Sequence, residues 1–233
     1  MSSRNSAFVA ACAIALTAGS AVAANTAESP NQLAERTIAV SAQFKPLFNG
    51  RNLDGWKHVG PGQFVVENGV LKTVGGMGLL WYTGEKIGNA VIRIVYKAPD
   101  DNGGGNSGVF IRIPEQPTEP WMPVNKGYEV QIDDSDDDWH RTGVLYSFTK
   151  TLAQPKVHEW NTMEIFIQDE RTTVLVNGIK VTEYTEGAPV PEKKGKHEPD
   201  RGKRAASGYI GLQNHDDKDT VYFKEISVAK LGK

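Results

Sequence analysis

The apolar residues of this chain come in short runs that are closed by glycine, proline, asparagine or aspartate. After Phe44 no stretch keeps a helical stripe through three turns. The runs are rich in Val, Ile, Phe, Tyr and Thr, which favour strands. The clearest are Gln63–Val66, Gly69–Val74, Ala90–Tyr96, Gly108–Ile113, Tyr128–Ile132, Gly143–Tyr146, Trp160–Ile167, Arg171–Val176, Tyr209–Leu212 and Val221–Val228. The pattern predicts an all-β antiparallel sandwich or barrel, in a single domain over residues 44–231.

Two Asn-Gly pairs mark tight turns between such runs. Asn177-Gly178 separates two β-rich segments, and Asn68-Gly69 does the same earlier in the chain. Asn-Gly suits the two-residue turns whose twist matches that of paired strands. We therefore expect a hairpin at each pair.

The first 23 residues have the composition of a secretory signal peptide. Arg4 is followed by the uncharged apolar run Ala7–Ala18, and Ala21-Val22-Ala23 offers small residues for cleavage after Ala23. The run is shorter than the ~20 residues of a membrane span, so no stable membrane span is expected after cleavage. These features predict a periplasmic or secreted protein with a flexible leader over 24–43. A lipoprotein box at Val9–Cys12 is the alternative.

Cysteine content and charge exclude several classes of function. Cys12 is the only cysteine of the 233 residues, so cleavage would remove it and exclude disulfides and thiol chemistry from the mature protein. The 26 basic and 28 acidic residues give a net charge of −2. This balance gives no reason to expect nucleic-acid binding.

Side-chain alternation places polar residues on one face of a predicted strand at 128–132. Because successive side chains point to opposite faces, Tyr128, Val130 and Ile132 share one face. Glu129, Gln131 and Asp133 share the other. A solvated sheet face is the plain interpretation. Two carboxylates and an amide with no basic residue among them favour a binding or catalytic row.

Two further strands repeat the pattern. In 106–113, Asn106 and Arg112 lie on the same face as Gly108, which would let a ligand approach the backbone. In 210–215, Gln213 and His215 lie opposite Ile210 and Leu212, and histidine is suited to acid–base work. Each residue also has a plain interpretation, a surface ion pair for Arg112 and a surface histidine for His215.

Aromatic residues complete the set of candidate ligand contacts. Trp81, Trp121 and Trp139 are predicted to be exposed and able to stack on sugar rings. Trp81 and Tyr146 are the two aromatic residues that we assign to substrate binding.

Two charged segments are less specific. The acidic run Asp133–Asp138 offers oxygen ligands for calcium but lacks the pattern of a helix–loop–helix site, so a solvated loop is favoured. The basic, proline-containing segment Glu186–Arg204 is interpreted as a solvated excursion, with Arg201 or Arg204 as the residues that would reach a site.

Five segments in order resemble the 3-keto-disaccharide hydrolase family. They are Phe44–Trp56, Asn106–Arg112, Tyr128–Asp133, Glu159–Asn161 and Gly211–His215. The resemblance extends from Phe44 to about residue 230. It implies a concanavalin A-like β-sandwich (jelly roll), a concave sheet that holds the ligand, and action on sugars oxidised at C3. Asn214 and Asp216 flank His215 where the family pattern has Asp and Gly.

The family's polar positions carry over to Asn106, Arg112, Glu129, Gln131, Asp133 and His215, which are the residues that alternation also selects. A C3 carbonyl acidifies the C2 proton, so a base can form an enolate and the C1 substituent can leave, followed by hydration. We expect Glu129 or His215 as base, and Arg112 with Asn106 or Gln131 at the enolate oxygen. Asp133 would orient His215, donate a proton or bind a divalent ion, and the three roles can be exchanged.

A divalent metal ion, calcium or a transition metal, is an open variant, with Glu129, Asp133 and His215 as its candidate ligands. Two other functions stay open. A retaining glycanase needs two carboxyls ~5–5.5 Å apart, whereas Glu129 and Asp133 lie four strand rises apart, ~13 Å between Cα atoms. A carbohydrate-binding module without catalysis is the second. In all three cases the partner is a carbohydrate, and the sequence leaves the oligomeric state open.

Overall fold

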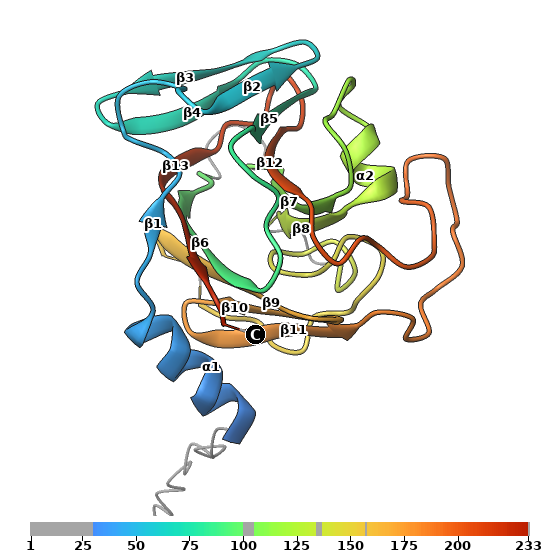
Figure 1. Cartoon of the computed structure of the whole chain (residues 1–233). Coiled ribbons are helices and arrows are strands. Elements are labelled where there is room, and N and C mark those ends of the chain that lie inside the picture. The colour runs from blue at the N-terminus through green and yellow to red at the C-terminus, as the bar shows by residue number, and fades with distance from the viewer. Residues whose placement is uncertain (1–29, 100–104, 134–136, 157, 233) are drawn as a thin grey trace, which may run out of the picture.

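The computed structural model describes residues 30–99, 105–133, 137–156 and 158–232 as two antiparallel sheets packed face to face (Figure 1). An eight-stranded sheet has the order β11-β10-β9-β6-β13-β4-β3, with β1 paired to β13, and a five-stranded sheet has the order β2-β5-β12-β7-β8. The elements are α1 (Pro30–Ser41), β1 (Lys45–Pro46), β2 (Trp56–Val59), β3 (Gln63–Glu67), β4 (Val70–Val74), β5 (Gly78–Tyr82), β6 (Ala90–Lys97), β7 (Ser107–Ile113), α2 (Met122–Lys126), β8 (Tyr128–Ile132), β9 (Asn161–Gln168), β10 (Arg171–Val176), β11 (Ile179–Thr185), β12 (Tyr209–Asn214) and β13 (Tyr222–Lys230). The prediction of an antiparallel β-sandwich is confirmed.

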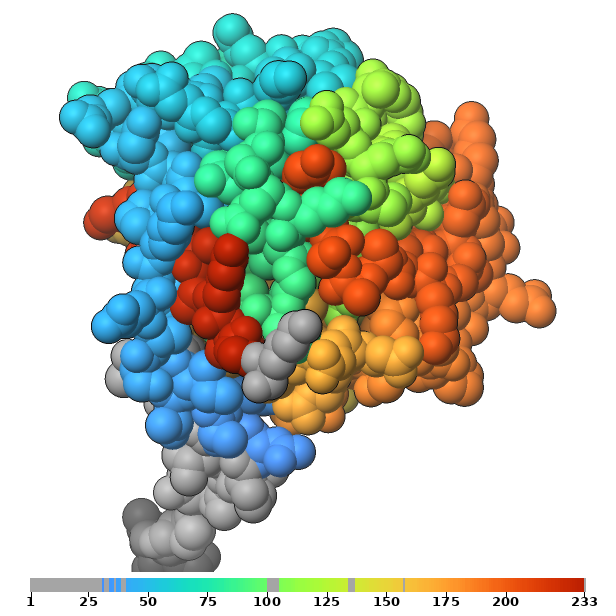
Figure 2. Space-filling model, in the orientation of Figure 1, coloured from blue at the N-terminus to red at the C-terminus, as the bar shows by residue number. Residues whose placement is uncertain are grey.

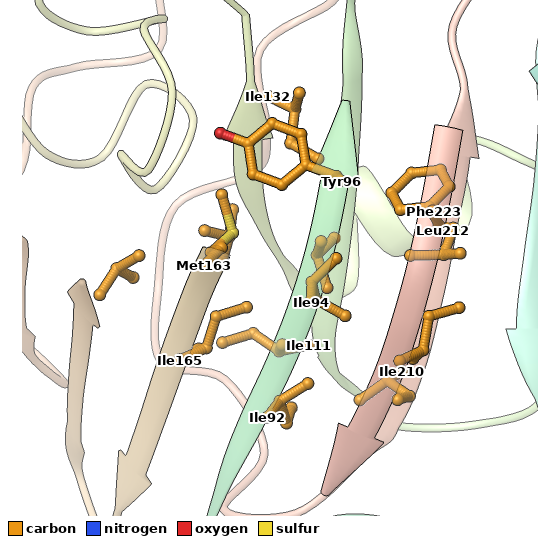
Figure 3. Close-up of a cluster of buried hydrophobic side chains, with 14 of the residues drawn as sticks. Ile92, Ile94, Tyr96, Ile111, Ile132, Met163, Ile165, Ile210, Leu212 and Phe223 are labelled. Carbon is orange, nitrogen blue, oxygen red and sulfur yellow. The ribbon is translucent and has the colours of Figure 1, made fainter. Parts of the chain in front are cut away.

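The core fills the space between the two sheets. Ile92 and Ile94 of β6 face Ile111 of β7 and Ile210 and Leu212 of β12, and all five side chains are buried (Figure 3). Each strand contributes alternate residues to this layer, which is the pattern that period-two alternation dictates. The face of the five-stranded sheet that points away from the core is therefore free to carry polar groups.

Both predicted Asn-Gly hairpins form. Asn68 and Gly69 have φ of 51° and 81° between β3 and β4, and Asn177 and Gly178 have 51° and 76° between β10 and β11. Two positive φ values are what this turn requires. The run 143–146, in contrast, is not a strand: it contributes only an isolated bridge from Leu145 to Val130, because the segment bends back through turns beside β8.

Residues 30–41 form α1, which differs from the expectation of a flexible leader over 24–43. The carboxylate of Glu35 is buried and lies 2.6 Å from Arg171 of β10. Ile38, one turn along the helix, packs on the cluster Val91, Phe166 and Leu175 on the outer face of the eight-stranded sheet. A helix forms because it covers these apolar residues. The predicted signal peptide lies outside the described residues.

Two segments border the free face of the five-stranded sheet. The short helix α2 lies beside β7 and β8, and the long connection between β11 and β12 passes next to it (orange in Figures 1 and 2). Arg204 of this connection donates a 2.7 Å hydrogen bond to the carbonyl of Gly127, directly after α2. No helix among the described residues has the length and apolar character needed to span a membrane.

Candidate functional site

A pocket of about 540 Å³ lies on the free face of the five-stranded sheet. Its floor comes from β8, β12 and the residue before β7. Its walls come from α2, from Asp133 and residues 137–146, and from the β11–β12 connection. The lining residues are Met77, Asn106, Trp121, Val124, Glu129, Gln131, Asp133, Asp137, His140, Tyr146, His197, Gln213 and His215.

Most residues that the sequence analysis selected line this one pocket. Glu129, Gln131 and Asp133 lie on one side of β8, as alternation predicts. Asn106, Gln213, His215 and Tyr146 line it as well. Gln131 donates a 3.1 Å hydrogen bond to the side-chain oxygen of Asn106. The expected polar rows from separate strands therefore converge because β12, β7 and β8 are neighbours in the sheet.

Glu129 is the buried acid of the pocket. Its side chain lies across Gly108 on the neighbouring strand, where an added Cβ would sit 2.6 Å from Glu129 Cγ. Only 6% of the residue is exposed. Burial raises the pKa of Glu129 to about 8, although a hydrogen bond from Gln213 opposes the shift. The carboxyl is therefore mostly neutral at pH 7 and is able to donate a hydrogen bond.

His215 is paired with a buried aspartate that the sequence analysis did not select. Its Nδ1 lies 2.6 Å from Oδ2 of Asp219, and the other oxygen of Asp219 accepts a 3.1 Å bond from the backbone N–H of Asn106. An aspartate on Nδ1 places the hydrogen there and leaves Nε2 as the basic nitrogen. The two residues are four apart across a loop, which has no strand periodicity, so alternation could not predict this contact.

A second histidine lines the opposite part of the pocket wall and was also missed. Nδ1 of His140 lies 2.7 Å from Oδ2 of Asp137, and its Nε2 lies 3.3 Å from Oγ of Ser147. Its ring packs 5.1 Å from the ring of Tyr146. The segment folds into turns, so alternation could not place these side chains.

Arg112 does not line the pocket, contrary to its predicted contact with the substrate. Its backbone has a φ of 56°, and the pairing of β7 with β12 shifts register at this point. This bulge interrupts the alternation, so Ile113 joins Phe110 in the cluster on the free face. The Arg112 side chain is buried and donates to the carbonyls of Ala205 and Asp169.

The tryptophans are placed differently from the expectation. Trp81 is only 2% exposed and packs edge-on against Tyr209, 5.0 Å between ring centroids, so the prediction of an exposed Trp81 is wrong. Trp81 belongs to β5, which lies between β2 and β12 in the sheet, and its side chain is part of a buried apolar cluster. Trp121 does line the pocket, and its ring lies 5.6 Å from that of His197. Trp139 is partly buried outside the lining.

The basic segment 186–204 reaches the pocket through an unexpected residue. His197 lines it, whereas neither of the two arginines considered does. Arg201 donates to the carbonyls of Pro191 and Pro199, and Arg204 to that of Gly127. Both arginines therefore hold the segment in place. Among the described residues, no lysine or arginine lines the pocket.

One group of side chains among the described residues could hold a metal ion: His215, Asp216 and Asp219. Of the predicted ligands only His215 belongs to it. Its members already bond to one another and to backbone N–H groups, Asp216 to those of Lys218 and Asp219. Carboxylate and imidazole donors fit a divalent ion, which would act as a Lewis acid when bound. Residues 134–136 of the acidic run lie outside the described residues.

Two side-chain oxygens in the pocket lack a partner. Oε1 of Gln131 and Oε1 of Gln213 are buried and accept no hydrogen bond from the residues that the structure describes. A buried acceptor without a donor is costly, so these atoms are available to hydroxyl groups of a ligand. Amide acceptors, a neutral carboxyl and three histidines together make a pocket suited to a polyhydroxylated molecule.

Comparison with known proteins points in the same direction. A family model described as a 3-keto-alpha-glucoside-1,2-lyase-like domain matches residues 43–229. Two structures of candidate glycosyl hydrolases from Parabacteroides distasonis ATCC 8503 are similar. One has 24% identity and a TM-score of 0.68, covering 88% of this chain and 98% of its own. The other has 25% identity and a TM-score of 0.63, covering 81% and 100%.

A carbohydrate-binding module, CBM66 from Bacillus subtilis, shares the fold at 14% identity, with a TM-score of 0.52 and coverage of 76% of this chain and 96% of its own. No curated protein matches the chain.

Proposed function

Because the chain belongs to the 3-keto-alpha-glucoside-1,2-lyase-like family, with a carbohydrate-type pocket on a lectin-like sandwich, we propose that it cleaves 3-keto-glycosides by elimination across C1 and C2. His215 removes the C2 proton, and the C1 substituent leaves from the resulting enolate. Hydration of the unsaturated product then completes a net hydrolysis. The observation that supports this reaction best is a neutral, buried Glu129 in the same pocket as a His–Asp pair.

His215 is the proposed base because its Nδ1 is held by Asp219 while its Nε2 has no hydrogen-bond partner among the residues that the structure describes. The aspartate stabilises the imidazolium that forms when the C2 proton is taken. This assignment selects one of the alternatives that the sequence left open, and it gives Glu129 a different role from base. A carboxyl that is mostly protonated at pH 7 cannot serve as a strong base at that pH.

Glu129 instead provides the hydrogen bond for the developing enolate oxygen. A neutral carboxylic acid in an apolar site donates to an enolate while avoiding a second negative charge. The amide of Gln131 or Asn106 adds a polar contact beside it. This replaces the role first expected of Arg112, whose guanidinium bonds to backbone carbonyls away from the pocket.

The decisive experiment compares matched substrates with the mature chain, residues 24–233. A glycoside and its 3-keto derivative are incubated separately, each with and without a chelator. The proposal expects cleavage of the keto sugar alone. Cleavage of the plain glycoside would contradict it and favour a retaining glycanase, and binding without cleavage would identify a carbohydrate-binding module. Loss of cleavage with chelator, restored by a divalent ion, would assign a metal to His215, Asp216 and Asp219.

The signal-peptide pattern supports a periplasmic or secreted location for this reaction. Expression of the full chain in a bacterium with a periplasm, followed by N-terminal sequencing, tests it. The expected mature protein begins at Ala24. Retention of Met1 in the cytoplasmic fraction would contradict it.

A further inference from the structure

Polar contacts link Asp137, His140, Ser147 and Tyr146 along the wall of the pocket. Asp137 Oδ2 lies 2.7 Å from His140 Nδ1, and His140 Nε2 lies 3.3 Å from Ser147 Oγ. The side chain of Ser147 also interacts with that of Tyr146, its neighbour in the chain, and this interaction opposes the rise in the Tyr146 pKa. Tyr146 and His140 line the pocket, whereas Ser147 is buried behind them.

The backbone at Ser147 is what makes this chain of contacts continuous. In an extended segment, the side chains of residues 146 and 147 would point to opposite sides. Ser147 has a φ of 58°, a left-handed conformation that is uncommon for a residue other than glycine. Strained residues of this kind cluster at functional sites.

Tyr146 is held beside the proposed reaction centre. Its backbone N–H donates a 2.9 Å hydrogen bond to the carbonyl of Glu129. Burial raises the pKa of Tyr146, so its hydroxyl stays protonated. The proposed roles of His215 and Glu129 leave one group without a partner, the oxygen of the departing substituent.

Resting on the proposed elimination, we infer that Tyr146 is a further catalytic residue, the acid that protonates the leaving oxygen, and that Ser147, His140 and Asp137 resupply its proton. The C1–O bond breaks as the phenolic proton moves to the departing oxygen. Solvent in the pocket, which His140 lines, first loads Nε2 of His140 with a proton. Ser147 then gives its hydroxyl proton to the phenolate and receives this proton from Nε2 of His140. The imidazolium becomes neutral with Nδ1–H still bonded to Asp137, and it is reloaded from solvent.

Asp137, His140 and Ser147 also resemble a nucleophilic triad, but the surroundings favour a relay. A serine nucleophile needs free backbone N–H groups to hold an oxyanion. The N–H of Ser147 is bonded to the carbonyl of Trp139, and that of Phe148 to the carbonyl of Leu145. The hydroxyl itself is buried behind the pocket wall.

The test uses leaving groups of different basicity on one 3-keto-glucoside. A p-nitrophenolate leaves without a proton, whereas a sugar alkoxide needs one. Tyr146→Phe is expected to lower kcat on the 3-keto-disaccharide by about 10²–10⁴-fold and to change kcat on the p-nitrophenyl compound by less than about tenfold. Ser147→Ala should show the same split to a smaller extent. Tyr222→Phe, on the other sheet, is the matched control and should leave both rates unchanged.

Equal losses on both substrates would overturn the inference, because a merely structural role affects them alike. Labelling of Ser147 by a fluorophosphonate would also overturn it and identify a nucleophile. Inactivity of the wild-type protein towards both substrates would refute the proposed elimination itself, so the two failures are distinguishable. Circular dichroism and the melting temperature of each variant show that it is folded.

Discussion

At the scale of single residues, Glu129 is a carboxyl that the fold keeps away from water in the pocket. Its neighbours are Gly108 beneath it and Gln213 beside it, and no cation offsets its burial among the pocket-lining residues that the structure describes. The folded protein therefore holds a proton on this carboxyl at pH values where the unfolded chain has lost it. Between about pH 4.5 and pH 8 stability falls as pH rises, since the folded state binds more protons than the unfolded state.

Replacement of Glu129 by Gln should remove this slope. The wild-type free energy of unfolding is expected to fall by up to about 1.4 kcal/mol per pH unit from this group within that window. Urea unfolding at pH 5, 6.5 and 8 measures the difference between the two proteins. The free energy of unfolding of Glu129→Gln should increase relative to that of the wild type as pH rises. If the two proteins show the same dependence of this free energy on pH, Glu129 is ionised in the folded state.

Gly108 gives an independent test of the same carboxyl. A methyl group at position 108 would overlap with Cγ and Cδ of Glu129, so Gly108→Ala must displace the side chain. We expect turnover of the 3-keto-glycoside to drop at least tenfold while the sheet stays folded. Gly88→Ala, where the added Cβ meets only Ser207 at 3.7 Å, is the control. Equal activity of the two variants would contradict this placement of Glu129.

His215→Gln should abolish most of the turnover with little effect on folding. Loss of a general base typically costs 10²–10⁴-fold in rate, and the side chain is 40% exposed, so stability should change by less than about 0.5 kcal/mol. The measurement is kcat on the 3-keto-glycoside together with the melting temperature. His158→Gln, outside the pocket, controls for loss of a histidine. A His215 variant with wild-type kcat would refute its role as base.

At the scale of elements, the β11–β12 connection is anchored by buried charge. Glu186 accepts hydrogen bonds from the Tyr128 hydroxyl at 2.9 Å and from the Arg204 backbone at 3.0 Å, and it lies 3.9 Å from Arg112 Nε. Glu186→Gln leaves the Arg112 guanidinium buried without its counter-charge, which should cost about 3 kcal/mol in urea unfolding. Glu170→Gln, an exposed pair with Lys203, should cost less than about 1 kcal/mol. Equal costs would show that the buried pair does not hold the connection.

Sequence periodicity predicted the elements well and their irregularities poorly. Alternation along residues 128–133 identified the correct pocket face, because β8 is a regular strand. The same rule failed at Arg112, where one left-handed residue shifts every later side chain to the other face. Loop residues such as Asp219 and His140 have no periodicity, so only their three-dimensional contacts identify them.

At the scale of the whole molecule, the outer faces of the two sheets differ in what they carry. The pocket lies on the five-stranded sheet, and α1 covers the far face of the eight-stranded sheet. A chain that begins at residue 42 loses the Glu35–Arg171 pair and the Ile38 contact. It should melt at a lower temperature than residues 24–233 but keep the same kcat. If the shortened chain lost kcat as well as thermal stability, α1 would be coupled to the pocket.

Removal of the C2 proton can be followed by cleaving a 3-keto-glycoside in D₂O and locating deuterium in the product by NMR. A reaction without enzyme controls for background exchange. Elimination predicts that the C2 hydrogen is lost, either in an unsaturated product or as deuterium at C2 after hydration. A released 3-keto sugar that retains its C2 hydrogen would show direct displacement at C1 and would contradict the proposed mechanism.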